Sequence, residues 1–471
     1  MDLIKNATPV GRAMGSIEQG WCRVITGGTG VTVLTLLLSK PHDVSVIRHA
    51  LLKIQKNHPL LRSRLHRHQT SNTLLSFITS PTPFIEVQEL DLESTSNILR
   101  LSDGDTPLQK ILEHELNENS WRSSQMLSAS SSPCNDLDLF FAKTYLLPDM
   151  SKVLALRFHS SICDRTTVVS VMRELPGIIL EDGGGDRVAG MRKDGGLRGE
   201  ANLGIEALMP AGVAKKGLLS RGVNMLAYSL SSLRLTNLNF KDTKQPRSSQ
   251  VVRMQLNSFE TQNVLAGCKS RGINLCGALT AAALMAANSM KSSRDSNRKY
   301  GVVTLTDCRS TLNPPLKDYN FGFYHSAVLN THSIKADETV WDLATRSYQA
   351  LQESKNSNKH FTDMYDLNYL MCKAAENPSL TPSSSLRTSL ISVFDVPVID
   401  NSNDLAYKKV GVEDSMACVS IHGVGPSIAI FDTLRDGRLD CACVYPSPLH
   451  SREQMADLVH RMKSLLVGAS Y

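Results

Sequence analysis

The sequence predicts an α/β protein of two halves joined by a linker. Stretches typical of strands alternate with stretches typical of helices in both halves of the 471-residue chain, which is the pattern of α/β and α+β folds. Residues 183–196 contain six glycines and several charges, so they cannot bury much apolar surface. We therefore expect an N-terminal subdomain over residues 1–182, a linker and crossover over 183–249, and a C-terminal subdomain over 250–471.

The N-terminal half shows two strand–helix units. Residues 30–38 predict a buried strand, and Asp43 is then a good N-cap for a helix with apolar side chains at helical spacing. Residues 152–158 predict a second strand. Residues 164–175 predict a helix, which we expect to end at Pro176.

The C-terminal half has the same alternation. Residues 275–290 are rich in alanine and predict a helix whose small side chains allow close packing. Residues 455–466 predict a final amphipathic helix. Strands are predicted at residues 251–256, 302–305, 386–396, 416–421, 427–432 and 439–445.

Composition excludes several classes of protein. The formal net charge is +6 without a run of Lys and Arg, so we expect no nucleic-acid partner. The ten cysteines form no C-x-x-C pattern and lie near no paired histidines, which predicts reduced thiols and no metal site. The first six residues lack a signal-peptide pattern, and the apolar stretch 31–38 is too short to span a bilayer. We therefore expect a cytoplasmic protein with no membrane span.

Three stretches carry the sequence signal for function. The first is residues 16–21 (Ser-Ile-Glu-Gln-Gly-Trp), followed by residues 58–62 (His-Pro-Leu-Leu-Arg). The second is residues 159–164 (His-Ser-Ser-Ile-Cys-Asp), at the junction of a predicted strand and helix, where function is often found. The third is residues 307–316 (Asp-Cys-Arg-Ser-Thr-Leu-Asn-Pro-Pro-Leu) with residues 319–323 (Tyr-Asn-Phe-Gly-Phe).

In this order and spacing, the three stretches resemble the superfamily of condensation domains and BAHD acyltransferases, and in particular plant condensation-domain-containing proteins. The resemblance implies two chloramphenicol-acetyltransferase-like subdomains, each a mixed sheet with flanking helices, and a tunnel at their interface. It also implies an acyl-CoA donor and a small-molecule acceptor that reach the tunnel from opposite sides, a monomeric protein, and no metal.

The resemblance assigns roles to three residues. The family's junction histidine is the general base that takes a proton from the acceptor's hydroxyl or amine, which makes His159 the predicted base. The family's aspartate points away from the substrate and pairs with an arginine, and these positions match Asp164 and Arg309. Elementary chemistry agrees with these roles. Imidazole titrates near pH ~6.5 and accepts a proton at physiological pH, and a buried aspartate needs a partner such as the two-pronged guanidinium.

The junction departs from the family pattern, in which three residues separate the histidine from the aspartate. Here four residues separate His159 from Asp164, so that Ser160 stands at the usual histidine position. Arg165 stands where a glycine usually follows the aspartate. The family's late Asp-Phe-Gly-Trp-Gly stretch is missing.

Three interpretations follow. In the first, the loop adjusts and His159 still reaches the tunnel. In the second, His325 or His422 is the base. In the third, the protein no longer transfers acyl groups and the fold binds a ligand.

Each residue also has a purely structural interpretation: His159 as a core residue of the strand, Asp164 as a helix N-cap, and His422 as part of a Gly-Pro turn.

The sequence therefore predicts an acyl-CoA-dependent acyltransferase that uses a histidine base and modifies a hydroxyl or amine of a small metabolite. One alternative is a catalytically inactive condensation-like protein that binds a ligand or regulates a partner. Another is a different reaction in the same tunnel, such as cyclisation or isomerisation.

Overall fold

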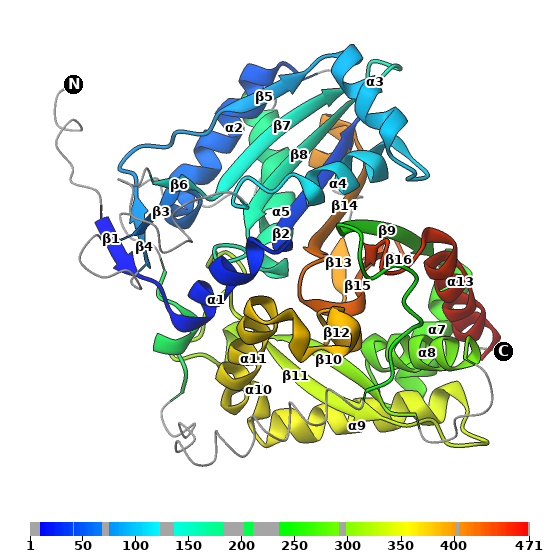
Figure 1. The fold of residues 1–471 in the computed structure, drawn as a ribbon. Coiled ribbons are helices and arrows are strands. Elements are labelled where there is room, and N and C mark those ends of the chain that lie inside the picture. Colours follow the sequence, from blue (N-terminus) through cyan, green and yellow to red (C-terminus); the bar gives the residue numbers. More distant parts are fainter. Residues whose placement is uncertain are drawn as a thin grey trace, which may run out of the picture.

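The computed structural model describes residues 10–40, 42–67, 75–122, 136–182, 202–210, 235–291, 298–400 and 405–469, which form two lobes (Figure 1). Of the predicted linker and crossover, residues 183–201 and 211–234 lie outside the described residues. The predicted subdomain boundaries therefore stay predictions.

The N-terminal lobe is built on a mixed five-stranded sheet. β8 is antiparallel to both β2 and β7, whereas β5 is parallel to β7. The strand order is β14 (Val412–Ile421), β2 (Thr29–Leu38), β8 (Lys152–His159), β7 (Phe140–Leu146) and β5 (Val87–Leu90).

The two faces of this sheet pack against different helices. α2 (Val44–Asn57) and α5 (Arg165–Asp182) cover the face that carries Leu34. α4 (Pro107–Asn117) packs on the face that carries Val33. Because successive side chains of a strand point to opposite faces, burial of both faces explains why β2 contains only valine, leucine, threonine and glycine.

The C-terminal lobe is built on a mixed seven-stranded sheet. Its strand order is β11 (His325–His332), β10 (Tyr300–Asp307), β12 (Arg387–Phe394), β15 (Gly425–Arg435), β16 (Arg438–Ser447) and β9 (Ser248–Gln255), with β13 (Val398–Asp400) beside β15. One face is covered by α7 (Ser258–Ser270), α8 (Leu275–Ser289), α9 (Val340–Asn356) and α13 (Arg452–Gly468). The alanines of α8 let it pack against both α9 and α13.

One strand of the C-terminal half belongs to the other lobe. β14 pairs antiparallel with β2, with Met416 opposite Thr35 and Cys418 opposite Val33. The chain then turns into β15, at the centre of the C-terminal sheet. The two sheets also share an apolar cluster that includes Val33 of β2 and Phe431 of β15. The lobes are therefore joined by a hydrogen-bonded strand as well as by side-chain packing.

The smaller described elements complete the chain. A four-stranded sheet has the order β1 (Val10–Ala13), β4 (Leu75–Thr79), β3 (Ser63–Arg67) and β6 (Leu137–Asp138). The remaining helices are α1 (Ser16–Ile25), α3 (Leu92–Leu101), α10 (Lys359–Thr362), α11 (Met364–Glu376) and α12 (Leu405–Val410). Short 3₁₀ turns are η1 (Pro59–Arg62), η3 (Ile205–Ala207), η4 (Arg309–Thr311), η5 (Pro378–Leu380) and η6 (Pro382–Ser384).

The predicted end of a helix at Pro176 is wrong, because α5 continues through this proline to Asp182. Proline has no N–H to donate to the carbonyl of Met172, one turn earlier. The hydroxyl of Tyr407, in α12, donates a hydrogen bond of 3.1 Å to that carbonyl instead. A tertiary contact therefore satisfies the group that proline leaves open.

The nine cysteines of the described residues are all buried and form no disulfide with one another. Within the same residues, no single helix has the length and apolar composition of a membrane span. α7 and α8 meet that criterion only together, as a pair bent by 106°.

The packing predicts the effect of a truncation in the N-terminal core. Leu34 is fully buried in β2, so Leu34→Ala should lower the free energy of unfolding by about 2–5 kcal/mol in urea titrations, since a cavity adds to the lost burial. Leu101→Ala is the matched control because Leu101 is 87% exposed at the end of α3, and its effect should stay within about 0.5 kcal/mol. Equal effects of the two changes would contradict the packing described.

Candidate active site

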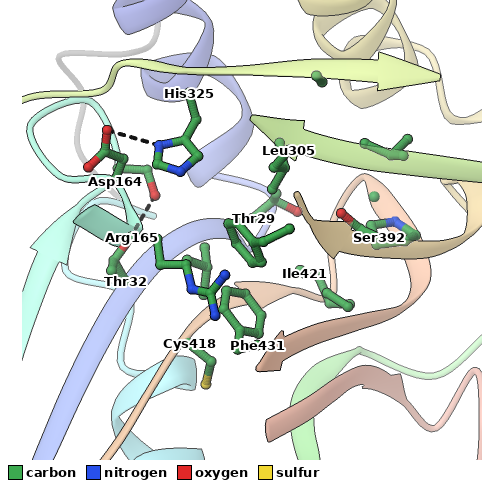
Figure 2. A pocket seen from close by; sticks show the side chains of 18 of the residues that line it. Thr29, Thr32, Asp164, Arg165, Leu305, His325, Ser392, Cys418, Ile421 and Phe431 are labelled. Carbon is green, nitrogen blue, oxygen red and sulfur yellow. Dashed lines mark hydrogen bonds and ion pairs between the residues drawn. The ribbon is translucent and has the colours of Figure 1, made fainter. Parts of the chain in front are cut away.

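A cavity of about 410 Å³ lies where the lobes meet. Its walls come from β14, from the open face of the C-terminal sheet, from the start of α5 and from α11. Figure 2 shows lining side chains from both lobes, among them Cys418, Phe431 and Arg165. On β15, Ala429, Phe431 and Thr433 line the cavity, whereas Ile428 and Ile430 point into the helix-covered core. The cavity is lined mainly by apolar side chains with a few polar groups, which is typical of a small-molecule site.

His159, the sequence-predicted base, does not line this cavity. It is the last residue of β8 and is fully buried, with its ring edge-on to Trp121 at 5.1 Å. Its Nδ1 accepts a hydrogen bond of 3.0 Å from the backbone N–H of Ser161. Burial lowers the pKa of His159 to about 3, so the ring is neutral near pH 7. Its role as base stays a prediction that this geometry does not favour.

Ser160, the next residue, does line the cavity. Its hydroxyl shares a hydrogen bond of 2.9 Å with the hydroxyl of Thr32 on β2. The cavity wall therefore carries a hydroxyl at the position where the family pattern has a histidine.

Asp164 and Arg309 form a two-pronged ion pair across the lobes. Nη1 of Arg309 lies 2.8 Å from Oδ2 of Asp164, and Nη2 lies 3.0 Å from Oδ1. Oδ1 also accepts the backbone N–H of Thr167 at 2.9 Å, which caps α5, and Oδ2 accepts the N–H of Tyr324 at 2.8 Å. The structure thus joins the two residues that the resemblance pairs, and Asp164 is a helix cap as well.

The charges around Asp164 decide its protonation. Burial alone would raise the pKa of the Asp164 carboxyl, but the adjacent Arg309 and His325 outweigh burial and hold this pKa below its usual range. Asp164 is therefore an anion near pH 7 although it is buried.

His325 is the histidine that the fold brings to the cavity. It is the first residue of β11, lies opposite Asp307 of β10 and lines the cavity. Its Nδ1 is 3.1 Å from Oδ2 of Asp164, and Figure 2 shows the ring between this carboxylate and the other lining side chains. The ring is also edge-on to Phe394 at 5.9 Å. With one ring nitrogen facing a carboxylate, the other remains to accept a proton.

Arg165 places a cation in the cavity wall. Its guanidinium lies 4.1 Å from the ring centre of Phe394, the ring that His325 also contacts. Nη2 is 2.8 Å from Oδ1 of Asp432, and Nη1 donates to the carbonyl of Val396 at 3.1 Å. In the sequence, Arg165 stands out only because it replaces the glycine that usually follows the motif aspartate. A charged side chain at this position indicates a partner nearby, which in the structure is Asp432 across the cavity.

His422 lies in the turn between β14 and β15 and does not line the cavity. Its Nδ1 is 3.0 Å from the hydroxyl of Ser249. The ring packs on Gly28, whose φ is +95° and where any Cβ would collide with the imidazole. Burial is the largest cause that lowers the pKa of His422 to about 4. Of the three candidate histidines, the structure places only His325 in the cavity wall.

No group of three His, Cys, Asp or Glu side chains that could hold a metal ion occurs among the described residues. The polar side chains of the cavity wall are hydroxyls, carboxylates, guanidinium groups, the His325 imidazole and the Asn368 carboxamide.

Comparisons with known proteins relate this geometry to a fold. Residues 245–354 match the family model described as phthiocerol/phthiodiolone dimycocerosyl transferase C-terminus. The chain is similar to the structure of polyketide synthase associated protein 5 from Mycobacterium tuberculosis, with 15% identity, a TM-score of 0.63 and 98% of each chain covered. It is also similar to TRI3 trichothecene 15-O-acetyltransferase from Fusarium sporotrichioides, with 10% identity, a TM-score of 0.68, and 98% of this chain and 95% of that chain covered.

A third similar structure is the first condensation domain of the calcium-dependent antibiotic synthetase in complex with a substrate analogue, with 13% identity, a TM-score of 0.63, and 98% of this chain and 97% of that chain covered. No curated protein sequence matches the chain. The predicted fold class is confirmed: a two-lobed α/β fold of mixed sheets and helices, as in condensation domains and chloramphenicol-acetyltransferase-like acyltransferases. The more specific resemblance to plant proteins stays a prediction.

The ion pair across the lobes predicts a pH-dependent loss of stability. Asp164→Asn keeps the helix cap but leaves the buried Arg309 with Asp307, at 3.1 Å, as its remaining carboxylate partner, so the free energy of unfolding at pH 7 should fall by about 1.5–3 kcal/mol, the range for hydrogen bonds to a charged group. Because the pKa of Asp164 is lower in the folded than in the unfolded chain, its contribution is complete above pH ~4 and shrinks as the pH falls further. Urea titrations at several pH values should show the wild type and the variant converging in acid.

Asp457→Asn is the matched control for this change, since Asp457 forms an exposed pair with Arg461 on α13. Its effect should stay below about 1 kcal/mol. A gap between wild type and Asp164→Asn that widens in acid would contradict the ionised state of Asp164.

Proposed function

We propose that this chain is an acyltransferase that moves an acyl group from a thioester donor, acyl-CoA, to a hydroxyl or amine of a small metabolite. The observation that carries the proposal is the position of His325, in the wall of the inter-lobe cavity and 3.1 Å from Asp164. The fold supports it, because chains with this architecture include acyltransferases and condensation domains.

In the proposed reaction, the Asp164 carboxylate, 3.1 Å from Nδ1 of His325, favours the tautomer with its proton on Nδ1, which leaves Nε2 as the proton acceptor. Nε2 takes the proton of the acceptor's O–H or N–H while the acceptor atom forms a bond to the thioester carbonyl carbon. The carbon–sulfur bond then breaks, and the imidazolium returns the proton to the departing thiolate. The transfer is direct and needs no covalent acyl-enzyme.

Arg309 and Arg165 have separate roles in this mechanism. Arg309 keeps Asp164 ionised and fixed in place, because both oxygens of the carboxylate are bound to the guanidinium. Arg165 brings a positive charge near His325, on the shared ring of Phe394. A cation in this wall favours the negative charge that develops on the carbonyl oxygen during the attack.

As the sequence predicts, we take the donor to be an acyl-CoA, the acceptor to be a small molecule with a hydroxyl or amine, and the protein to be a cytoplasmic monomer. A donor and an acceptor that enter from different sides fit a cavity whose lining residues come from both lobes. The mainly apolar lining favours a donor with an apolar acyl chain.

A second candidate function is ligand binding without turnover. It is favoured by Ser160, which stands in the cavity wall at the usual position of the family's base and forms a hydrogen bond to Thr32. A hydroxyl held in this way supplies no general base. If His325 does not act as a general base either, the cavity binds a ligand without catalysing a reaction.

The proposal predicts different consequences for the three histidines. His325→Gln should lower the rate of thiol release from a panel of acyl-CoA thioesters with pooled alcohol and amine acceptors by about 10²–10⁴-fold, the range of general-base removal. His159→Gln and His422→Gln should keep most of the activity, because neither residue lines the cavity.

The opposite result, full activity of His325→Gln with a hundredfold loss in His159→Gln, would return the base to His159. The absence of turnover with every donor, together with a rise in melting temperature on adding a ligand, would favour the second candidate function.

A further inference from the structure

Two hydroxyl groups in the cavity wall share a single hydrogen bond. Ser160, directly after β8, and Thr32 of β2 both line the cavity, and each is 2% exposed. Their oxygen atoms lie 2.9 Å apart, and either of them can be the donor. Each hydroxyl carries one proton, and the contact between them uses only one of the two. The second proton has no acceptor in the part of the chain that the structure describes.

Another Ser–Thr pair in the same chain shows the completed arrangement. In the four-stranded sheet, the hydroxyls of Ser63 and Thr79 lie 2.8 Å apart, and both residues are buried. Ser63 donates its proton to the carbonyl of Pro59 at 3.0 Å, so Thr79 donates to Ser63 and both protons are used. This pair does not line the cavity. The pair in the cavity wall therefore differs from it by one donor that is left for a ligand.

The backbone holds Ser160 in place beside an apolar neighbour. Its N–H donates to the carbonyl of Gly30 at 3.0 Å, and its carbonyl accepts the N–H of Cys163 at 3.4 Å. Gly30 has a φ of +103°, and a Cβ there would lie 2.9 Å from the ring of Trp21 and 3.4 Å from the Ser160 hydroxyl. The indole of Trp21, which ends the first sequence stretch, therefore packs close to the hydroxyl pair. An apolar neighbour of this kind makes an unused polar group more costly.

The same wall leads from the hydroxyl pair to the candidate base. The ring of Phe323 lies 4.9 Å from that of Trp21 and 6.4 Å from that of His325, measured between ring centres, and all three rings line the cavity. Figure 2 shows Thr32 and His325 among the lining side chains. One aromatic ring thus separates the indole beside the pair from the imidazole. A small group of atoms in the cavity can therefore contact both the pair and the base.

We propose that the Ser160–Thr32 pair is a hydrogen-bond donor site for the carbonyl oxygen of the ligand's acyl group. This inference rests on the proposed function for the identity of the ligand, an acyl-CoA. A carbonyl oxygen accepts hydrogen bonds and donates none, so it suits a pair with one spare proton. The position at which the family pattern has a base holds the carbonyl in this chain, while His325 supplies the base from the other lobe. The hydroxyl protons stay on their oxygens throughout.

Isothermal titration with two unreactive analogues of acyl-CoA, made with short, medium and long chains, tests the site. In the first analogue a methylene replaces the sulfur, which leaves a ketone that cannot be transferred. In the second, a methylene also replaces the carbonyl. A cavity without a donor should favour the second analogue, because a carbonyl loses its hydration on binding. The wild-type protein should instead bind the ketone about 2–10-fold more tightly, the effect of one hydrogen bond.

Ser160→Ala combined with Thr32→Val removes both hydroxyls of the pair. Replacing both partners of a hydrogen bond by apolar groups of similar shape costs little stability, so this double variant should fold. It should lose the preference for the ketone or reverse it. Ser63→Ala combined with Thr79→Val is the matched control, since it removes the same two groups outside the cavity, and it should keep the wild-type preference.

The wild-type comparison alone can overturn the proposal, because it needs no variant to fold. Equal affinities for the two analogues, a preference for the methylene analogue, or no binding of either would do so, as would a ketone preference that persists without the two hydroxyls. A ketone preference without thiol release from any acyl-CoA would keep the carbonyl site and remove the acyltransferase. Thiol release without a ketone preference would keep the acyltransferase and remove the carbonyl site.

Discussion

The buried ion pair between Asp164 and Arg309 is the contact on which the rest of the site depends. A single carboxylate, brought to the start of α5, pairs with an arginine of the other lobe, caps the helix and faces His325. A carboxylate is tolerated in the protein interior only when both of its oxygens are hydrogen-bonded or ion-paired, and both oxygens of Asp164 are. The same contact therefore orders the backbone after β8, ties the lobes together and orients the imidazole in the cavity.

The arrangement of strands around this pair determines which side chains can reach the cavity. β8 ends at His159, which is directed into the N-terminal core, and the chain then turns so that Ser160 and Asp164 face the other lobe. His325 reaches the site from the opposite direction, at the beginning of an edge strand. A base supplied by one lobe and its orienting carboxylate by the other would make activity depend on the relative position of the lobes.

Parts of this architecture could be predicted from the sequence and parts could not. The alternating strands and helices and the cap at Asp164 follow from local patterns, whereas the pairing of Asp164 with Arg309 follows from the family resemblance. The place of His325 depends on the register of β10 and β11, which brings it opposite Asp307 across a long loop, and no local pattern encodes this register. The apolar sequence of β14 predicts a strand but does not say that its partner is β2. The continuation of α5 through Pro176 depends on a hydroxyl of a distant helix, Tyr407.

The path of β14 has a consequence for how substrates enter. Because this strand is hydrogen-bonded along β2 and continues through the turn at residues 422–424 into the centre of the C-terminal sheet, a separation of the lobes must pivot at this turn or break a β-ladder. Residues on both sides of the turn, Ile421 and Gly425, also line the cavity. A rotation of one lobe about the turn would therefore change the width of the cavity on the side away from it.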